Sequence, residues 1–489
     1  MKLKYSMWIY GLVLLMTAGS CKKYINLTPE DATYDQVFWT SGANVDKAVS
    51  GAYGLLRSAL KDTRSHFIFG DLPTREFTLD AGYFWNYQDL TYDHSNHYSY
   101  VPYLEGALLD WTRFYGIINQ CHLIVENATK IPDSKYDGGR EEKDRLIGEG
   151  HFLRGYTYFY MTRIWGDPVL TKESLKDPLH IEPIARSTEK EALDYCIEEL
   201  KTAASLLPAD MNKVRADKGA AWAALAEVYA WRHDYTTAKK YCDSVIDQGG
   251  YSLEPVSTYE NIWKGDSQES IFELFMKYDQ ASNEASADFF NIFLYQPIVN
   301  RSMTTAWRVN TDYAWNLFQD SLVDKRFDKI FGNRTTSNAA LIKYASINYY
   351  DANRPTVYVV DNNLVLLRLA DIILLRAEAR YYTGDDAGAR ADVNAIRTRA
   401  GLDPILPGDP FDAVTIYEER EKELYGEGSL AYDFIRMILT NPDSNIDPSL
   451  KDFYTPERIA KKGYYWPLNM RVLLPQNSLL TQNEWWKNH

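Results

Sequence analysis

Cysteine is scarce in this sequence, and the motifs that mark common enzyme classes are missing. Four cysteines in 489 residues are too few for the disulfide framework of a small secreted protein, and no CxxC pair offers a metal site. The sequence has no GxSxG turn, Walker loop, GxGxxG turn or HExxH helix. His94 and His97 form the only close histidine pair, and they have no obvious third ligand. These absences predict a protein with no catalytic residues, no bound metal and no cofactor.

Positive charge and long apolar runs are also limited. Lys and Arg number 53 against 67 Asp and Glu, so the formal net charge is −14. That balance argues against nucleic acid or an anionic membrane surface as the main partner. Apolar residues make up 45% of the chain, with 13 Trp, 37 Tyr and 19 Phe, which is enough for a large folded core and excludes a disordered protein.

The first twenty residues have the pattern of a secretory signal. Lys2 and Lys4 precede an apolar run over residues 7–16, which is too short to cross a bilayer because crossing takes ~20 apolar residues. Small residues follow, and then Cys21. The pattern predicts a lipoprotein signal peptide over residues 1–20, with Cys21 as the acylated first residue of the mature chain. The alternative is ordinary cleavage beside an unrelated cysteine.

Helical periodicity dominates the rest of the chain. From Leu193 to Leu207 apolar residues recur every three or four positions, after a capping box formed by Thr188 and Glu191. Similar patterns predict further helices over 45–60, 109–129, 152–159, 367–381 and 415–425. The strongest candidate for a short strand lies over 356–360. The other cysteines fall in helical, largely apolar patterns, which predicts buried free thiols at Cys121, Cys196 and Cys242.

One segment matches the two-helix tetratricopeptide repeat. Its spacing is carried by Trp222, Leu225, Ala226, Tyr229 and Ala238. Small alanines let two helices approach closely, and the large rings fill the space between them. A second copy fits less uniquely over residues 370–400. Because one repeat cannot bury its apolar face alone, several helix pairs should stack. We therefore predict an all-α dominated fold of such pairs, with long aromatic-rich loops and little β structure.

Three long stretches between the helices, 80–103, 264–315 and 331–363, are irregular and rich in aromatic residues. Aromatic rings beside amide and charged groups suit a sugar, because rings cover its C–H face while polar groups bond its hydroxyls. The alternative is that the rings only pack the loops onto the helices. The candidate ligand-binding residues are Tyr83, Trp85, Asn86, Tyr87, Trp307, Arg308, Asn310 and Tyr313.

The run from Glu418 to Glu423, with sequence EEREKE, raises the question of paired glycosidase carboxylates. Carboxylates and cations three or four positions apart on a helix usually form a surface lattice of ion pairs. We therefore predict a surface lattice here, not a catalytic pair.

Ordered blocks over nearly the whole chain resemble the SusD/RagB family, the starch-utilisation-system D family of outer-membrane nutrient-binding lipoproteins. The blocks are the signal ending in Cys21, Glu149–Phe159, Trp165–Leu170, Arg186 with Thr188, Arg215–Trp222, Leu367–Ala379, Asn394–Leu402, Glu419–Gly428, Trp466–Leu468 and Leu480–Asn483. One departure follows Gly428, where the family usually has a His-Arg pair and this chain has Ser429 and Leu430. The charged contact of that arginine is missing or replaced here.

The resemblance implies a single body over 21–489, with an N-terminal part over about 21–230 and a C-terminal SusD/RagB part over about 260–489. It also implies a lipid anchor in the outer membrane and a protein that faces outside. Family members cap a TonB-dependent barrel transporter of the SusC type as a hinged lid, and no catalysis is expected. The ligand of this member is expected to be an oligosaccharide or polysaccharide. The alternatives are a peptide-binding member of the family and a tetratricopeptide adaptor of the transporter that binds no ligand.

Overall fold

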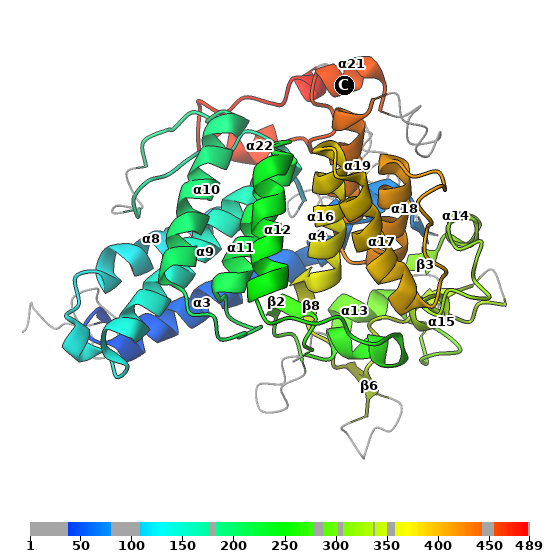
Figure 1. Ribbon diagram of the computed structural model, residues 1–489. Coiled ribbons are helices and arrows are strands. Elements are labelled where there is room, and N and C mark those ends of the chain that lie inside the picture. Colours follow the sequence, from blue (N-terminus) through cyan, green and yellow to red (C-terminus); the bar gives the residue numbers. More distant parts are fainter. Residues whose placement is uncertain are drawn as a thin grey trace, which may run out of the picture.

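The computed structural model describes residues 38–79, 108–175, 181–265, 267–277, 287–301, 307–335, 338–349, 357–442 and 454–487. Helices form most of this structure (Figure 1). Among the described residues, no helix combines the length and the apolar character needed to cross a membrane.

The long helices confirm all six helical predictions and add further members. They are α3 (Gly42–Lys61), α8 (Thr112–Ala128), α9 (Gly139–Trp165), α10 (Glu189–Leu206), α11 (Lys218–Trp231), α12 (Tyr235–Gln248), α16 (Leu369–Tyr382), α17 (Asp386–Ala400), α18 (Ala413–Leu424) and α19 (Leu430–Thr440). The short helices are α4 (Ser65–Gly70), α13 (Ala287–Phe290), α14 (Thr311–Leu317), α15 (Phe327–Ile330), α21 (Pro456–Ala460) and α22 (Met470–Leu473). Segments of 3₁₀ helix include η2 (Leu72–Thr74), η4 (Val256–Trp263) and η5 (Asn291–Phe293).

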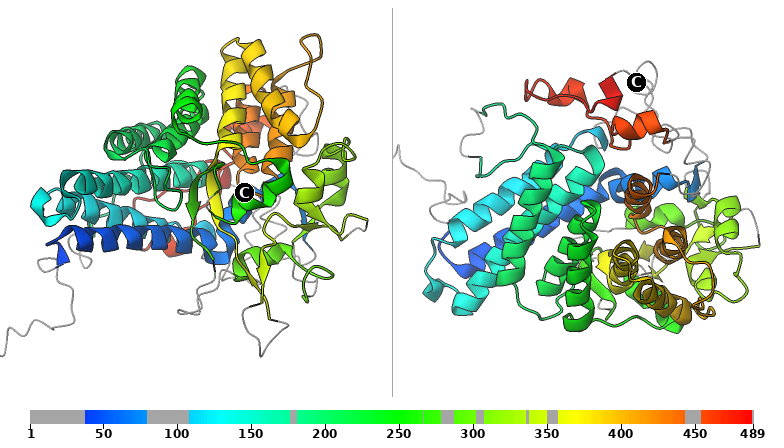
Figure 2. Two further views of the ribbon diagram at one scale, coloured as in Figure 1. Left: turned by 60° about the horizontal axis from the view of Figure 1, so that its bottom comes forward. Right: turned by 45° about the horizontal axis from the view of Figure 1, so that its top comes forward.

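The long helices pack as neighbours in the order α3, α8, α9, α10, α11, α12, α16 and α17 (Figures 1 and 2). The predicted repeat forms the pair α11–α12, in which Ala226 and Ala238 are fully buried and Tyr229 stacks on Tyr241 with ring centroids 5.6 Å apart. The predicted second copy is the pair α16–α17, and α16 packs directly on α12. The helix-pair fold is therefore confirmed.

Local sequence explains how these helices begin and how closely they approach. The predicted capping box starts α10: Glu191 N donates to Thr188 Oγ1 at 3.3 Å, and Thr188 N donates to the Glu191 carboxylate at 2.8 Å. Gly155 lets α9 lie tightly against α10, because a Cβ added there would come within 2.9 Å of the Glu199 Cβ.

The strands of the described residues form four two-stranded antiparallel pairs. They are β1 (Phe77–Leu79) with β3 (Trp307–Val309), β2 (Ser270–Leu274) with β8 (Leu364–Arg368), β4 (Phe331–Gly332) with β5 (Ala340–Leu341), and β6 (Ile347–Asn348) with β7 (Val359–Val360). The strand predicted over 356–360 thus corresponds to the short β7.

The remaining cysteines confirm the prediction of buried free thiols. Cys121, Cys196 and Cys242 are all buried and unpaired with one another. Burial raises the pKa of the Cys121 thiol to about 12, so it stays protonated at neutral pH.

Backbone contacts join the N-terminal and C-terminal parts of the body. The turn between α18 and α19 lies against α4 and η2, where Gly428 N donates to the Asp71 carboxylate at 2.7 Å. Gly70 is required at this contact, because a Cβ there would overlap the Gly428 carbonyl oxygen. His66 Nε2 lies 3.0 Å from the Glu427 carbonyl oxygen across the same contact. Segments about 360 positions apart in the chain are thereby fixed as one unit.

Candidate functional site

The β1–β3 pair brings together the two segments that carry the candidate ligand-binding residues. Leu79 lies opposite Trp307 in the register, and Phe77 lies opposite Val309. The described residues stop at Leu79 and resume at residue 108, and a second gap over residues 302–306 ends at Trp307. Five predicted residues lie outside the described structure: Tyr83, Trp85, Asn86, Tyr87 and the proposed acylation site Cys21.

Trp307 lies in the core. Trp307 is 1% exposed. The centroid of its ring lies 5.6 Å from that of Phe77 and 6.0 Å from that of Phe293. A ring covered to this degree offers no face to a ligand in this conformation. Its position fits the alternative stated above, in which the ring packs its loop onto the body.

Asn310 serves the local fold. Its Oδ1 accepts a hydrogen bond from Tyr313 N at 3.3 Å and caps α14, while its Nδ2 donates to the Arg75 carbonyl oxygen at 3.0 Å. The backbone N of Asn310 donates to the Glu76 carbonyl oxygen at 2.8 Å. The amide thus holds α14 against the segment that precedes β1.

Arg308 and Tyr313 retain partial exposure. Arg308 alternates with two buried neighbours on β3 and lies opposite the exposed Thr78, so it is on the outer side of the strand pair. The Tyr313 hydroxyl donates to Glu421 Oε1 at 2.5 Å, and burial, followed by the charge of Glu421, raises its pKa well above the ordinary value.

The acidic run on α18 does form an ion-pair lattice, but the prediction that it lies on the surface is wrong. Arg326, Arg368 and Arg399, with side chains 0–7% exposed, pair with Glu419, Glu423 and Glu269, whose side chains are 0–3% exposed. We call these six residues the buried lattice. Helix α18 packs against α16 and α17, so its carboxylates meet cations from other elements, which spacing along α18 does not reveal.

The electrostatics of the buried lattice favour structure over catalysis. Burial alone would raise the pKa of Glu423, but Arg399, Arg368 and Arg326 together hold it well below the usual value. A glycosidase acid needs a raised pKa and an open substrate cavity. Glu423 has the opposite shift, and its side chain is fully buried.

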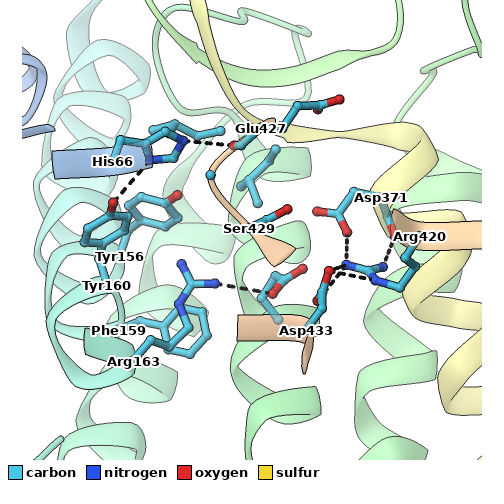
Figure 3. A pocket seen from close by; sticks show the side chains of 14 residues that line it. His66, Tyr156, Phe159, Tyr160, Arg163, Asp371, Arg420, Glu427, Ser429 and Asp433 are labelled. Carbon is cyan, nitrogen blue, oxygen red and sulfur yellow. Dashed lines mark hydrogen bonds and ion pairs between the residues drawn. The ribbon is translucent and has the colours of Figure 1, made fainter. Parts of the chain in front are cut away.

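A small cavity lies between α9, α11, α16 and the α18–α19 turn (Figure 3). Its volume of about 30 Å³ holds about one water molecule, which excludes a sugar. Burial, followed by the charge of Asp371, raises the pKa of Glu227 to about 7, and Arg163 lies 3.7 Å from its carboxylate. Burial lowers the pKa of His66, which also lines the cavity, to about 4. Ser429, the position where the chain departs from the family pattern, lines the same cavity.

A second, larger cavity was not predicted. We call it the C-terminal cleft; it has a volume of about 370 Å³ and is lined by residues 167, 186, 460–462, 465, 481–484 and 487. In Figures 1 and 2 the red C-terminal segment crosses the end of the body where α10 begins. No local sequence pattern could have revealed the cleft, because its walls come from segments about 300 positions apart that meet only in the folded chain.

Among the described residues, no group of three or more His, Cys, Asp or Glu side chains is arranged to hold a metal ion.

Comparison with family models gives two matches. A model described as "Starch-binding associating with outer membrane" matches residues 25–230, and a model described as "SusD family" matches residues 316–486. The chain is 26% identical to SusD-like protein P38 of Formosa agariphila, over 96% of this chain and 97% of that protein. It is 22% identical to SusD-like protein P2 of the same organism, over 96% and 98% of the two chains.

Solved structures share the fold. A SusD homolog from Bacteroides thetaiotaomicron superposes with a TM-score of 0.77 at 21% identity, covering 92% of this chain and 99% of that one. A laminarin-binding SusD-like protein superposes with a TM-score of 0.70 at 19% identity, covering 91% and 99%.

Proposed function

The chain belongs to the SusD/RagB family, and from this membership we propose that it is a cell-surface lipoprotein that binds an oligosaccharide or polysaccharide and delivers it, as a lid, to a TonB-dependent barrel transporter of the SusC type. By family and fold it is a binding protein and not an enzyme.

Two comparisons support a glycan as the ligand. The N-terminal model carries the description of a starch-binding protein that associates with the outer membrane, and a structural neighbour binds laminarin.

The observation that carries the proposal for the site is the pairing of Leu79 with Trp307. Tyr83 follows Leu79 by four positions, and four residues of fully extended chain span at most ~14 Å. We assign Tyr83, Trp85, Asn86 and Tyr87 to one ligand-binding surface with Arg308 and Tyr313. Trp307 and Asn310 support this surface from the core side, through the contacts described above.

A lid must also release its ligand inward. Affinity in the micromolar to millimolar range, about −4 to −8 kcal/mol, satisfies both capture and release. The lipid at Cys21 and the transporter together keep the lid at the outer membrane.

The test is calorimetric titration of the chain from residue 22 against plant, fungal and host polysaccharides and against peptides. Trp85→Ala is compared with Trp39→Ala, a control at a half-buried aromatic residue just before α3. We expect saturable glycan binding that weakens at least tenfold in Trp85→Ala and is unchanged in Trp39→Ala.

The alternatives predict different outcomes of the same titration. Binding of peptides without glycans would identify a peptide-binding family member. Absence of any ligand, with the transporter still co-purifying from the native membrane, would identify an adaptor. A cleaved product in any mixture would contradict the assignment as a binding protein.

A further inference from the structure

The C-terminal cleft is cationic in a chain of opposite net charge. Four cationic and two acidic side chains line it, whereas the whole chain carries a formal charge of −14. Its volume of about 370 Å³ lies in the range of small-molecule sites. Tyr465 in its wall is 1% exposed, so recognition there must use charge and hydrogen bonds instead of stacking on a ring.

Arg186 supplies a fixed positive charge at the cleft. Its guanidinium donates to the carbonyl oxygens of Asp167, Thr481 and Trp165 at 2.5, 2.8 and 2.9 Å, and it lies 5.5 Å from the centre of the Trp111 ring. These three bonds use three of the five N–H donors of the side chain. They go to backbone carbonyls, and the Asp167 carboxylate acts on the guanidinium through its charge alone.

Lys461 and Lys487 supply charges that a ligand can recruit. They pair with Glu457 and Glu484 at 2.7 Å each; the lysine side chains are 39% and 49% exposed and the glutamates 68% and 61%. Exposed pairs of this kind contribute roughly 0–1 kcal/mol, so redirecting either ammonium costs little. The third lysine differs, because Lys462 is bound to Glu189, which also accepts a hydrogen bond from Tyr465.

The cleft also offers groups for hydroxyls. The Asp167 carboxylate accepts one hydrogen bond, from Glu189 N at 2.9 Å, and a carboxylate has about four acceptor sites. Cations and a carboxylate acceptor in one cleft match a sugar unit that carries both a carboxylate and hydroxyl groups. We infer that the C-terminal cleft is a second glycan subsite that takes a uronic acid unit, with Arg186, Lys461 and Lys487 facing its carboxylate and Asp167 accepting from its hydroxyls.

This inference rests on the proposed function, because its ligand is part of a glycan. The probes are galacturonate and glucuronate oligosaccharides, matched neutral glucose and galactose oligosaccharides of the same length, and an acidic peptide. The test variant is Lys461→Gln/Lys487→Gln. The control is Lys239→Gln/Lys264→Gln. It removes two lysines of similar exposure, 37% and 44%, which pair with Asp243 and Glu260 away from the cleft.

We expect the wild-type chain to bind uronate oligosaccharides, and the test variant to bind them at least tenfold more weakly. The control variant should stay within twofold, and raising the salt concentration should weaken uronate binding in the wild type far more than in the test variant.

Three results would overturn the subsite. They are absence of uronate binding, equal losses in both double variants, and preference for the acidic peptide. If neutral glycans still bind when one of these results is obtained, only the subsite is contradicted and the proposed function is not. Absence of binding to every glycan would contradict the proposed function itself.

Discussion

Charged side chains occur in two contrasting settings in this protein. In the buried lattice, three arginines and three glutamates lie almost without solvent contact and bind one another. At the C-terminal cleft, Lys461 and Lys487 pair with glutamates that are more exposed than the lysines themselves. Charged residues therefore have different roles in the two settings. The buried lattice fixes α16, α17 and α18 relative to one another, while the cleft lysines are available to a ligand.

The largest effect is expected from breaking the buried lattice. Arg368→Gln leaves Glu423 and Glu269 buried with less positive charge beside them, and loss of one partner from a buried pair costs about 3–5 kcal/mol. Urea unfolding followed by circular dichroism measures this loss. A change in the unfolding free energy below about 1 kcal/mol would mean that the buried lattice stabilises the fold no more than the exposed pairs do. The contrast between the two settings would then be wrong.

Removing Trp307 should have an effect of similar or slightly smaller size. Trp307→Ala deletes a core ring packed between Phe77 and Phe293, and such truncations cost about 3–5 kcal/mol. Trp307→Phe is the matched control, because it keeps a ring and should recover part of the lost unfolding free energy. Unchanged stability in Trp307→Ala would show that the ring does not stabilise the fold.

Two side chains of the small cavity in Figure 3 are expected to give opposite pH dependences of the unfolding free energy. Glu227 has a pKa of about 7 in the folded state, above the ordinary value of ~4.3, so the folded state keeps a proton that the unfolded state has lost. Its contribution to the unfolding free energy is therefore lost as pH rises from about 4.5 through 7, by up to ~3 kcal/mol. His66 has a pKa of about 4, so its contribution is lost as pH falls from about 6.5 through 4.

Unfolding free energies measured from pH 4.5 to 8 test this pair. Relative to wild type, Glu227→Gln should make stability rise more steeply with pH, and His66→Gln should make it rise less steeply. Parallel curves for all three proteins would contradict the assigned shifts.

The smallest effect on stability is expected at the cleft. Lys461→Gln/Lys487→Gln removes two exposed pairs and should change the unfolding free energy by less than ~1 kcal/mol. Thermal unfolding in parallel with the Lys239→Gln/Lys264→Gln control measures this. A loss of about 2 kcal/mol or more would place the cleft lysines with the scaffold.

Local sequence predicted most of the fold because helix starts and helix pairs are encoded within short windows. Thr188 with Glu191 predicted the start of α10, and Trp222 to Ala238 predicted the pair α11–α12. The same local view misplaced Glu423, because its partners Arg326, Arg368 and Arg399 come from other elements. The cleft was missed for a related reason: its walls meet only after folding.

The candidate site was harder to predict than the fold. Aromatic residues in a loop suit both a ligand and a core, and sequence alone does not distinguish these roles. Trp307 shows the difficulty, since it lies in an aromatic-rich stretch yet is buried. Arg308 and Tyr313 are the described candidates that keep partial exposure, and the Tyr313 hydroxyl is bound to Glu421.

The central claim is that glycan recognition is separate from the scaffold. The most direct test measures glycan affinity and unfolding free energy on the same two variants. Trp85→Ala should lose at least tenfold in affinity with its unfolding free energy unchanged within ~0.5 kcal/mol, and Trp307→Ala should lose stability. Stability lost in Trp85→Ala, or affinity lost in Trp307→Ala without a loss of stability, would contradict the claim.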